Sequence, residues 1–127
     1  MPDVNRGNRP MSPHLTVYRP QMTSMTSIFV RITGNALLVA GLLIVWWFVA
    51  AATSEAAFAT ANFVITSWFG DLVMALSTWA LWYHLFGGLR HLIWDTGRGL
   101  ELDAAENLGM IMIIASLAMT VFTIVVV

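Results

Sequence analysis

The side chains best suited to chemistry in this sequence are histidines that lie in an otherwise apolar stretch. His84 precedes Arg90 by six residues, so a helix would separate the imidazole from that charge by about 9 Å. An ionisable group this far from the nearest charge, inside an apolar stretch, is a candidate functional residue, because burying it in an apolar medium is costly. Imidazole is an axial ligand of heme iron, but a buried histidine can also simply bond a neighbouring helix. His91 lies about 10 Å further along, where heme propionates would emerge.

Small residues accompany the two histidines on one helical face. At about 100° per residue, this face holds Ser77, Ala80, His84, Gly87, Gly88 and His91. The lack of large side chains leaves room for a flat macrocycle, against whose edges Trp79 and Trp82 would pack. The alternative is contact with another helix, since stripes of small residues are also packing faces in membranes.

The number of histidines limits how such a heme could be held. Axial ligands approach iron from opposite faces, which two imidazoles on one helix face cannot do. The chain has only one further histidine, His14, which precedes the apolar segments. We therefore expect the second axial ligand to come from another polypeptide, with Met74 and Met112 as alternatives within this chain.

A second polar cluster lies at the start of the first apolar segment. Ser27 and Arg31 are four residues apart, with Gly34 and Asn35 one turn further, so they share a helical face. Hydroxyl and guanidinium donors suit a quinone, whose two carbonyls accept hydrogen bonds. Arg31 could instead pair with a heme propionate, or extend to the lipid headgroups as an interfacial arginine.

The elements that carry these residues are predicted to be membrane helices. The chain is 58% hydrophobic and 10% charged, and its net charge of −1 gives no reason to expect a nucleic acid partner. Residues 32–54, 72–89 and 107–127 lack charges, and each is close to the ~20 residues that cross a bilayer. We predict one all-α membrane domain over residues 1–127, with transmembrane helices at about 31–54, 63–93 and 106–127.

The distribution of arginine predicts the orientation. All six basic residues are arginines, and they either precede the first span or flank the loop between the second and third: Arg6, Arg9, Arg19, Arg31, Arg90 and Arg98. Because cytoplasmic segments retain basic residues, we expect a cytoplasmic N-terminus and a periplasmic C-terminus. We also expect Asp71 and Arg90 to bracket the second span, with both charges in contact with water.

Residues 1–30 are predicted to form an arm outside the membrane. Three prolines beyond Pro2 interrupt this segment, which resembles neither a cleavable signal peptide nor an amphipathic transit helix. We expect the arm to lie extended along a partner protein. A bacterial inner membrane is the simplest setting for the whole chain.

Three segments in this order resemble the cytochrome b subunit of succinate dehydrogenase. They are RPMSPHLTVYR at 9–19, SIFVRITG at 27–34 and HLFGGLRHLIWD at 84–95. The resemblance implies that His84 is an axial ligand of one heme b shared with a companion membrane-anchor subunit, and that Ser27 and Arg31 line a ubiquinone pocket. Many members carry histidine where this chain has Val30, so a propionate contact is lost or replaced, with Arg31 and His91 as available substitutes.

The resemblance also implies a function within a larger assembly. Flavoprotein and iron–sulfur subunits would oxidise succinate and pass electrons to ubiquinone in the tricarboxylic acid cycle and respiratory electron transport. This chain would anchor them in the membrane and catalyse nothing alone. The alternatives are the anchor of a quinol-oxidising fumarate reductase, and a heme-free structural anchor in which His84 is only a packing residue.

Overall fold

The computed structural model describes residues 17–127, and its regular elements are α-helices without a strand in that range. In chain order they are α1 (Met22–Thr53), α2 (Glu55–Ile65), α3 (Trp68–Asp95) and α4 (Leu102–Val126). Of these, α1, α3 and α4 are long and apolar enough to cross a membrane, whereas α2 is a short apolar helix. The predicted all-α architecture with three candidate spans is therefore confirmed.

The first helix begins earlier than predicted. It starts at Met22, so the expectation of a non-helical arm up to residue 30 is wrong for residues 22–30. A capping box explains the start: the Gln21 side chain and the Ser24 hydroxyl each pair with the other residue's backbone. Pro20 immediately precedes this cap, and helices commonly begin after such a break. The rest of the predicted arm, including His14, lies largely outside the described residues.

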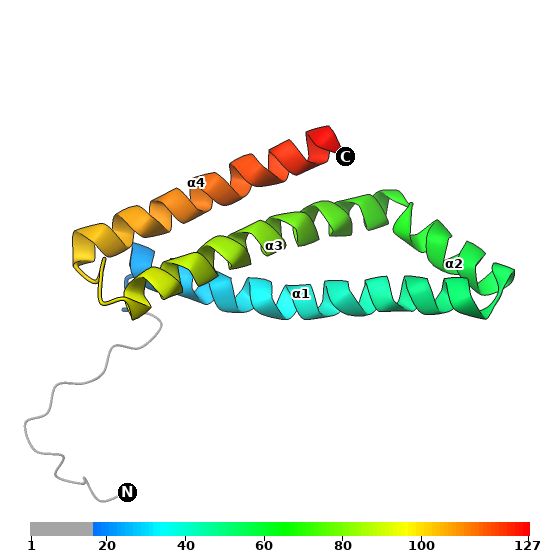
Figure 1. The fold of residues 1–127 in the computed structure, drawn as a ribbon, viewed down its shortest axis with the longest axis horizontal. Helices are drawn as coiled ribbons and strands as arrows, with labels where there is room; N and C mark the ends of the chain where they lie inside the picture. The colour runs from blue at the N-terminus through cyan, green and yellow to red at the C-terminus, as the bar shows by residue number, and fades with distance from the viewer. Residues whose placement is uncertain (1–16) are drawn as a thin grey trace, which may run out of the picture.

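A short helix precedes the second span. The predicted helix at 63–93 is wrong at its start, because α2 ends at Ile65 and α3 begins at Trp68. Ser67 caps α3 by accepting the Gly70 N–H at 3.2 Å. Figure 1 shows α2 folding back beside the end of α1, at the turn between α1 and α3. Hydropathy does not register a cap inside an apolar stretch, so the sequence did not predict this break between α2 and α3.

Gly70 makes this turn possible, and its replacement provides a test. A β carbon there would overlap the backbone carbonyl of Ile65, which cannot move independently of the turn. Gly70→Ala should lower the stability of the purified assembly by about 1–3 kcal/mol, the usual cost of overpacking. Gly41→Ala is the matched control, because nothing lies within 4 Å of its added carbon. Thermal unfolding would measure both, and equal midpoints would contradict this account.

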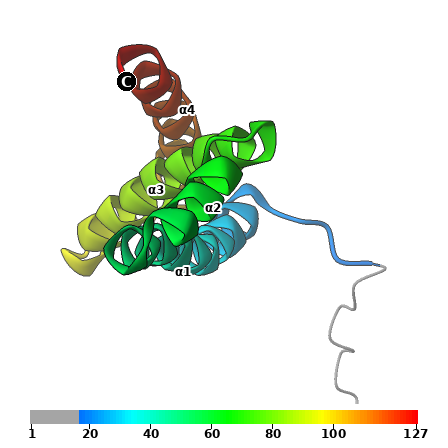
Figure 2. The same ribbon diagram turned by 90° about the vertical axis from the view of Figure 1, so that its right-hand side faces the viewer.

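The three long helices meet most closely at one end. Figures 1 and 2 show α3 between α1 and α4, with the start of α1, the end of α3 and the start of α4 gathered together. A buried cluster of Val30, Tyr83 and Met112 takes one side chain from each helix. Small and hydroxyl residues let α4 pack on α3, and its buried positions are Ala105, Gly109, Met112, Ser116 and Thr120.

Trp82 also contributes to this packing. Its indole N–H donates to the Thr123 hydroxyl of α4 at 3.0 Å, and its ring stacks with that of Phe86. The indole N–H bonds α4 because such a donor in an apolar setting needs an acceptor. The packing of the Trp82 ring against a macrocycle stays a prediction.

Candidate functional site

His84 lies half-buried where α3 crosses α1. Its Nδ1 is 3.0 Å from the backbone carbonyl oxygen of Val30, a residue 54 positions earlier in the chain. A carbonyl can only accept a hydrogen bond, so Nδ1 carries the proton. This tautomer has its lone pair on Nε2. An imidazole whose tautomer and orientation are fixed in this way is the usual form of a metal-bound histidine.

Glycines on both helices permit this close approach. A β carbon on Gly34 of α1 would lie 2.9 Å from Cε1 of His84. On α3, a β carbon at Gly87 would lie 2.5 Å from Cγ2 of Val30. Larger residues at either position would push the helices apart and lengthen the bond between Nδ1 and the Val30 carbonyl.

The small-residue face predicted from the sequence has two roles. Ala80 and Gly87 are buried within the chain, so part of the face is a helix-packing surface. Ser77 and Gly88 are only half-buried, as His84 is, and a β carbon at Gly88 would meet nothing within 4 Å. The second part of the face therefore leaves room beside the imidazole for a group from outside the chain.

The surroundings of His84 can be tested against a heme. Within residues 17–127, no three or more histidine, cysteine, aspartate or glutamate side chains gather to hold a metal ion. A single imidazole can then serve a metal only where other ligands are supplied, as a porphyrin supplies them. The fixed tautomer, the partial exposure and the open space at Gly88 all fit an axial ligand of heme iron.

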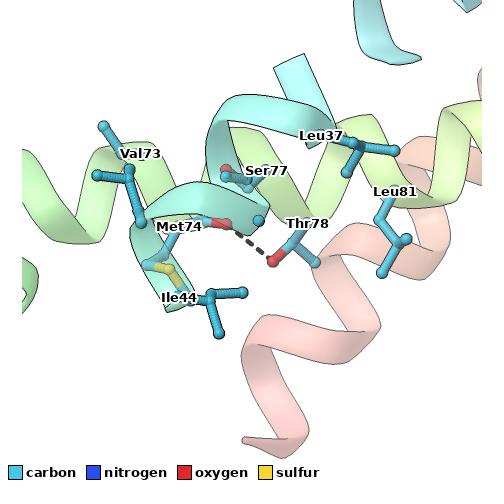
Figure 3. A pocket seen from close by; sticks show the side chains of 10 residues that line it. Leu37, Ile44, Val73, Met74, Ser77, Thr78 and Leu81 are labelled. Carbon is cyan, nitrogen blue, oxygen red and sulfur yellow. Dashed lines mark hydrogen bonds between the residues drawn. The ribbon is translucent and has the colours of Figure 1, made fainter. Parts of the chain in front are cut away.

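An apolar groove extends from this contact along the line where α1 meets α3. It encloses about 390 Å³, and it begins with Leu37 of α1 and Leu81 of α3, each three residues from the contact between Gly34 and His84. Figure 3 shows Ser77 and Met74 further along the same groove. Of the two methionines considered as ligands, Met74 is thus accessible from outside. Met112 is instead buried in the core, which argues against ligation of an external group.

The predicted quinone residues lie next to this site. Ser27 is half-buried and Arg31 is exposed on α1, and Arg31 directly follows the residue whose carbonyl bonds His84. His91 is exposed on α3, where its ring meets that of Trp94 edge-on at 5.3 Å between centroids. The packing of α1 on α3 therefore brings together two clusters that the sequence could only place on separate helices.

Arg90 departs from expectation. It was predicted to reach water at the end of the second span, but it is only 2% exposed. Its Nη1 donates to the Thr26 hydroxyl at 2.8 Å, and its guanidinium lies 4.6 Å from the centre of the Trp94 ring. Its Nε and Nη2 are buried without a partner in residues 17–127. The first turns of α4 cover it, with Nη1 only 3.3 Å from where a β carbon on Gly109 would lie.

Tyr83 also bonds Thr26 of α1. Its hydroxyl donates to the Thr26 carbonyl at 3.3 Å, so α3 holds Thr26 through both its backbone and its side chain. Thr26 directly precedes Ser27, and the pair of donors therefore positions the part of α1 that carries the predicted quinone residue Ser27. The sequence did not identify Tyr83 and Arg90 as residues that hold α1. The seven-residue spacing of Tyr83 and Arg90, with Gly87 between them on one face, was the available signal.

Comparisons with known proteins identify the family of this chain. Residues 5–124 match the family described as succinate dehydrogenase/fumarate reductase transmembrane subunit. The chain is 52% identical over 126 residues to the succinate dehydrogenase cytochrome b556 subunit of Paracoccus denitrificans, covering 99% of this chain and 97% of that protein. It is 37% identical over 113 residues to the subunit of the same name from Rickettsia bellii, covering 89% and 88%.

A relative named as a cytochrome b560 subunit is also similar. The chain is 40% identical over 111 residues to the succinate dehydrogenase cytochrome b560 subunit of Reclinomonas americana, covering 84% of this chain and 77% of that protein. These matches confirm the family indicated by the three sequence segments. Together with the three candidate spans, the bacterial relatives support a multi-pass protein of the bacterial inner membrane. The chain therefore belongs to the succinate dehydrogenase/fumarate reductase transmembrane subunits, and within them to the cytochrome b subunits of succinate dehydrogenase.

Proposed function

We propose that this chain is the heme-bearing membrane anchor of a succinate:ubiquinone oxidoreductase. It holds the flavoprotein and iron–sulfur subunits at the bilayer, in the tricarboxylic acid cycle and respiratory electron transport. The observation that carries the proposal is the hydrogen bond from Nδ1 of His84 to the Val30 carbonyl, which leaves Nε2 free at a half-buried position. When bound there, heme b would supply one-electron redox chemistry whose potential depends on its ligands and burial.

A single heme would be shared with a companion membrane-anchor subunit that supplies the second axial ligand. His84 and His91 are one heptad apart on α3 and so cannot ligate from opposite sides. Val30 stands where many family members have histidine, and its side chain is buried in the core. A replacement contact for the propionates must come from exposed neighbours, and Arg31 and His91 are both exposed.

The quinone site would form where Ser27 and Arg31 meet the iron–sulfur subunit. The hydroxyl and guanidinium would donate hydrogen bonds to the carbonyl oxygens of ubiquinone, and the fixed positive charge would favour the electron-rich reduced forms. The contacts of Thr26 with Tyr83 and Arg90 hold this segment of α1 against the other two helices. Because Ser27 and Arg31 keep some exposure, a partner can complete the pocket.

The proposed orientation has the arginine-rich end in the cytoplasm. The start of α1 and the end of α3 lie where the three helices gather (Figure 1), and Arg31 and Arg98 belong to the first part of α1 and to the loop after α3. Basic residues favour the cytoplasmic side, so the N-terminus would be cytoplasmic and the C-terminus periplasmic. In the single domain 1–127, the residues before α1 would then lie beside the soluble subunits.

The native assembly provides a direct test. It can be purified through a tag on this chain, its subunits identified by mass, and its reduced-minus-oxidised absorption spectrum recorded. Flavoprotein, iron–sulfur and second anchor subunits with a b-type spectrum are expected. A colourless assembly would refute the heme proposal and leave a structural anchor. Quinone extraction and a midpoint titration would separate a succinate dehydrogenase from a quinol-oxidising fumarate reductase.

Arg31→Ala tests the quinone proposal. Loss of a charged hydrogen bond to the substrate should slow ubiquinone reduction by about tenfold or more, since such bonds contribute roughly 1.5–3 kcal/mol. Succinate oxidation with an artificial electron acceptor should stay near the parent rate, because that reaction bypasses the site. Arg98→Ala removes an exposed arginine from the loop after α3 and is the control. Parent-like ubiquinone turnover in Arg31→Ala would exclude Arg31 from the site.

A further inference from the structure

The carbonyl that bonds His84 is shared with another donor. The Thr33 hydroxyl lies 2.9 Å from the Val30 carbonyl oxygen and 2.8 Å from that of Phe29. A hydroxyl has one hydrogen, so Thr33 can donate to only one of these carbonyls at a time. Thr33 is 2% exposed, which leaves it little access to other acceptors.

Competition for the Val30 carbonyl affects the strength of the hydrogen bond from the His84 imidazole. In an α-helix the Val30 carbonyl also accepts the N–H of Gly34, so with His84 and Thr33 it faces three donors with two lone pairs. When the Thr33 hydroxyl turns to Phe29, the bond from Nδ1 of His84 strengthens. A stronger bond at Nδ1 makes Nε2 a better electron donor, and a better donor favours ferric over ferrous iron.

We propose that Thr33 and Gly34 are positioning residues that tune His84 as an iron ligand through the Val30 carbonyl. Thr33 sets the strength of the hydrogen bond by competing for the carbonyl, and Gly34 sets its length by letting α1 approach the ring. This inference rests on the proposed ligation of heme by His84. It assigns to α1 a role in the heme site that does not require a side chain of α1 to contact the iron.

Thr33→Val removes the competing hydroxyl with little change in shape. In the purified complex, the midpoint potential of the heme should fall, with about a threefold rise in the ferric-to-ferrous ratio at a fixed applied potential. A threefold change in this ratio corresponds to a shift of about 30 mV in midpoint potential, because a one-electron couple shifts by ~59 mV for each tenfold change in the ratio. Thr33→Ser keeps the hydroxyl and should retain the parent potential. Thr120→Val makes the same exchange at a buried site on α4, where the hydroxyl bonds Ser116 at 2.7 Å, and should also leave the potential unchanged.

Gly34→Ala should act in the opposite direction. Its β carbon would lie 2.9 Å from Cε1 of His84 and displace the ring, which weakens the bond to Val30. The midpoint potential should rise, and the low-spin electron paramagnetic resonance g values should change with the ring orientation. Gly41→Ala, with nothing within 4 Å of the added carbon, should preserve both.

The two variants distinguish the tuning role from heme ligation itself. A complex that contains heme, but whose potential is the same in Thr33→Val as in the parent, would overturn the inference and leave ligation by His84 intact. An equal shift in Thr33→Val and Thr120→Val would also overturn it, because general repacking would then be the cause. A parent complex without heme would refute the proposed function, and this inference with it.

Discussion

His84→Ala is expected to abolish the b-type absorption spectrum of the assembled complex. The variant removes the imidazole whose Nε2 is proposed to ligate the heme iron, and an alanine side chain offers the iron no replacement ligand. The helices should still pack, because the buried contacts of α3 involve mainly Tyr83, Gly87 and Arg90. The reduced-minus-oxidised difference spectrum, normalised to subunit content, measures the effect.

His91→Ala is the matched control for this experiment. His91 lies on the same helix but is exposed and contacts only the edge of Trp94 among the aromatic rings of residues 17–127. It should retain the heme bands, with at most a shift in potential from a changed propionate environment. A complete b-type spectrum in His84→Ala would show that another residue ligates the iron, and Met74 would then be the first candidate in this chain.

Arg90→Ala is expected to cause the largest loss of stability. It removes a long side chain from the junction of three helices, together with the bond to Thr26 and the contact with the Trp94 ring. Truncations of large buried side chains typically cost about 2–5 kcal/mol. Thermal unfolding of the purified complex would measure this loss of stability. The transition can be monitored through the loss of ubiquinone reduction and through the release of heme. A parent-like unfolding midpoint would contradict the burial of Arg90.

Arg90→Met separates volume from charge at the same position. Methionine refills much of the space and removes a cation whose Nε and Nη2 have no partner in the described chain. Most of the lost stability should therefore return. If Arg90→Met is as unstable as Arg90→Ala, the hydrogen bond to Thr26 outweighs the packing of the side chain.

The membrane character of the chain could be predicted without a structure. A run of about 20 uncharged residues has few stable alternatives to a spanning helix, because each backbone polar group must find a partner within the segment. Three such runs therefore predicted three helices, and three short segments predicted the family. The same hydropathy signal could not locate the cap at Ser67 that separates α2 from α3, since a single hydroxyl hardly changes the average over a span.

The exposure of a charged side chain was harder to predict than its position along a helix. Counting residues gives the position along the helix axis, but whether the side chain reaches water depends on which other helix covers it. Arg90 was placed at the correct end of α3 yet predicted to be in water, whereas the first turns of α4 enclose it. No local pattern showed that Gly109 would leave space for a guanidinium.

The contact between His84 and the Val30 carbonyl illustrates the same limit at the candidate site. The sequence identified His84, Ser27 and Arg31 from their own chemistry, and their roles in binding heme and quinone stay predictions. It could not show that residues 54 positions apart share a hydrogen bond. That bond depends on the rotation and separation of two helices, and a turn of about 100°, one residue, would direct the imidazole elsewhere. The glycines at 34 and 87 allow the helices to approach closely enough, and only their packing shows which backbone carbonyl the ring meets.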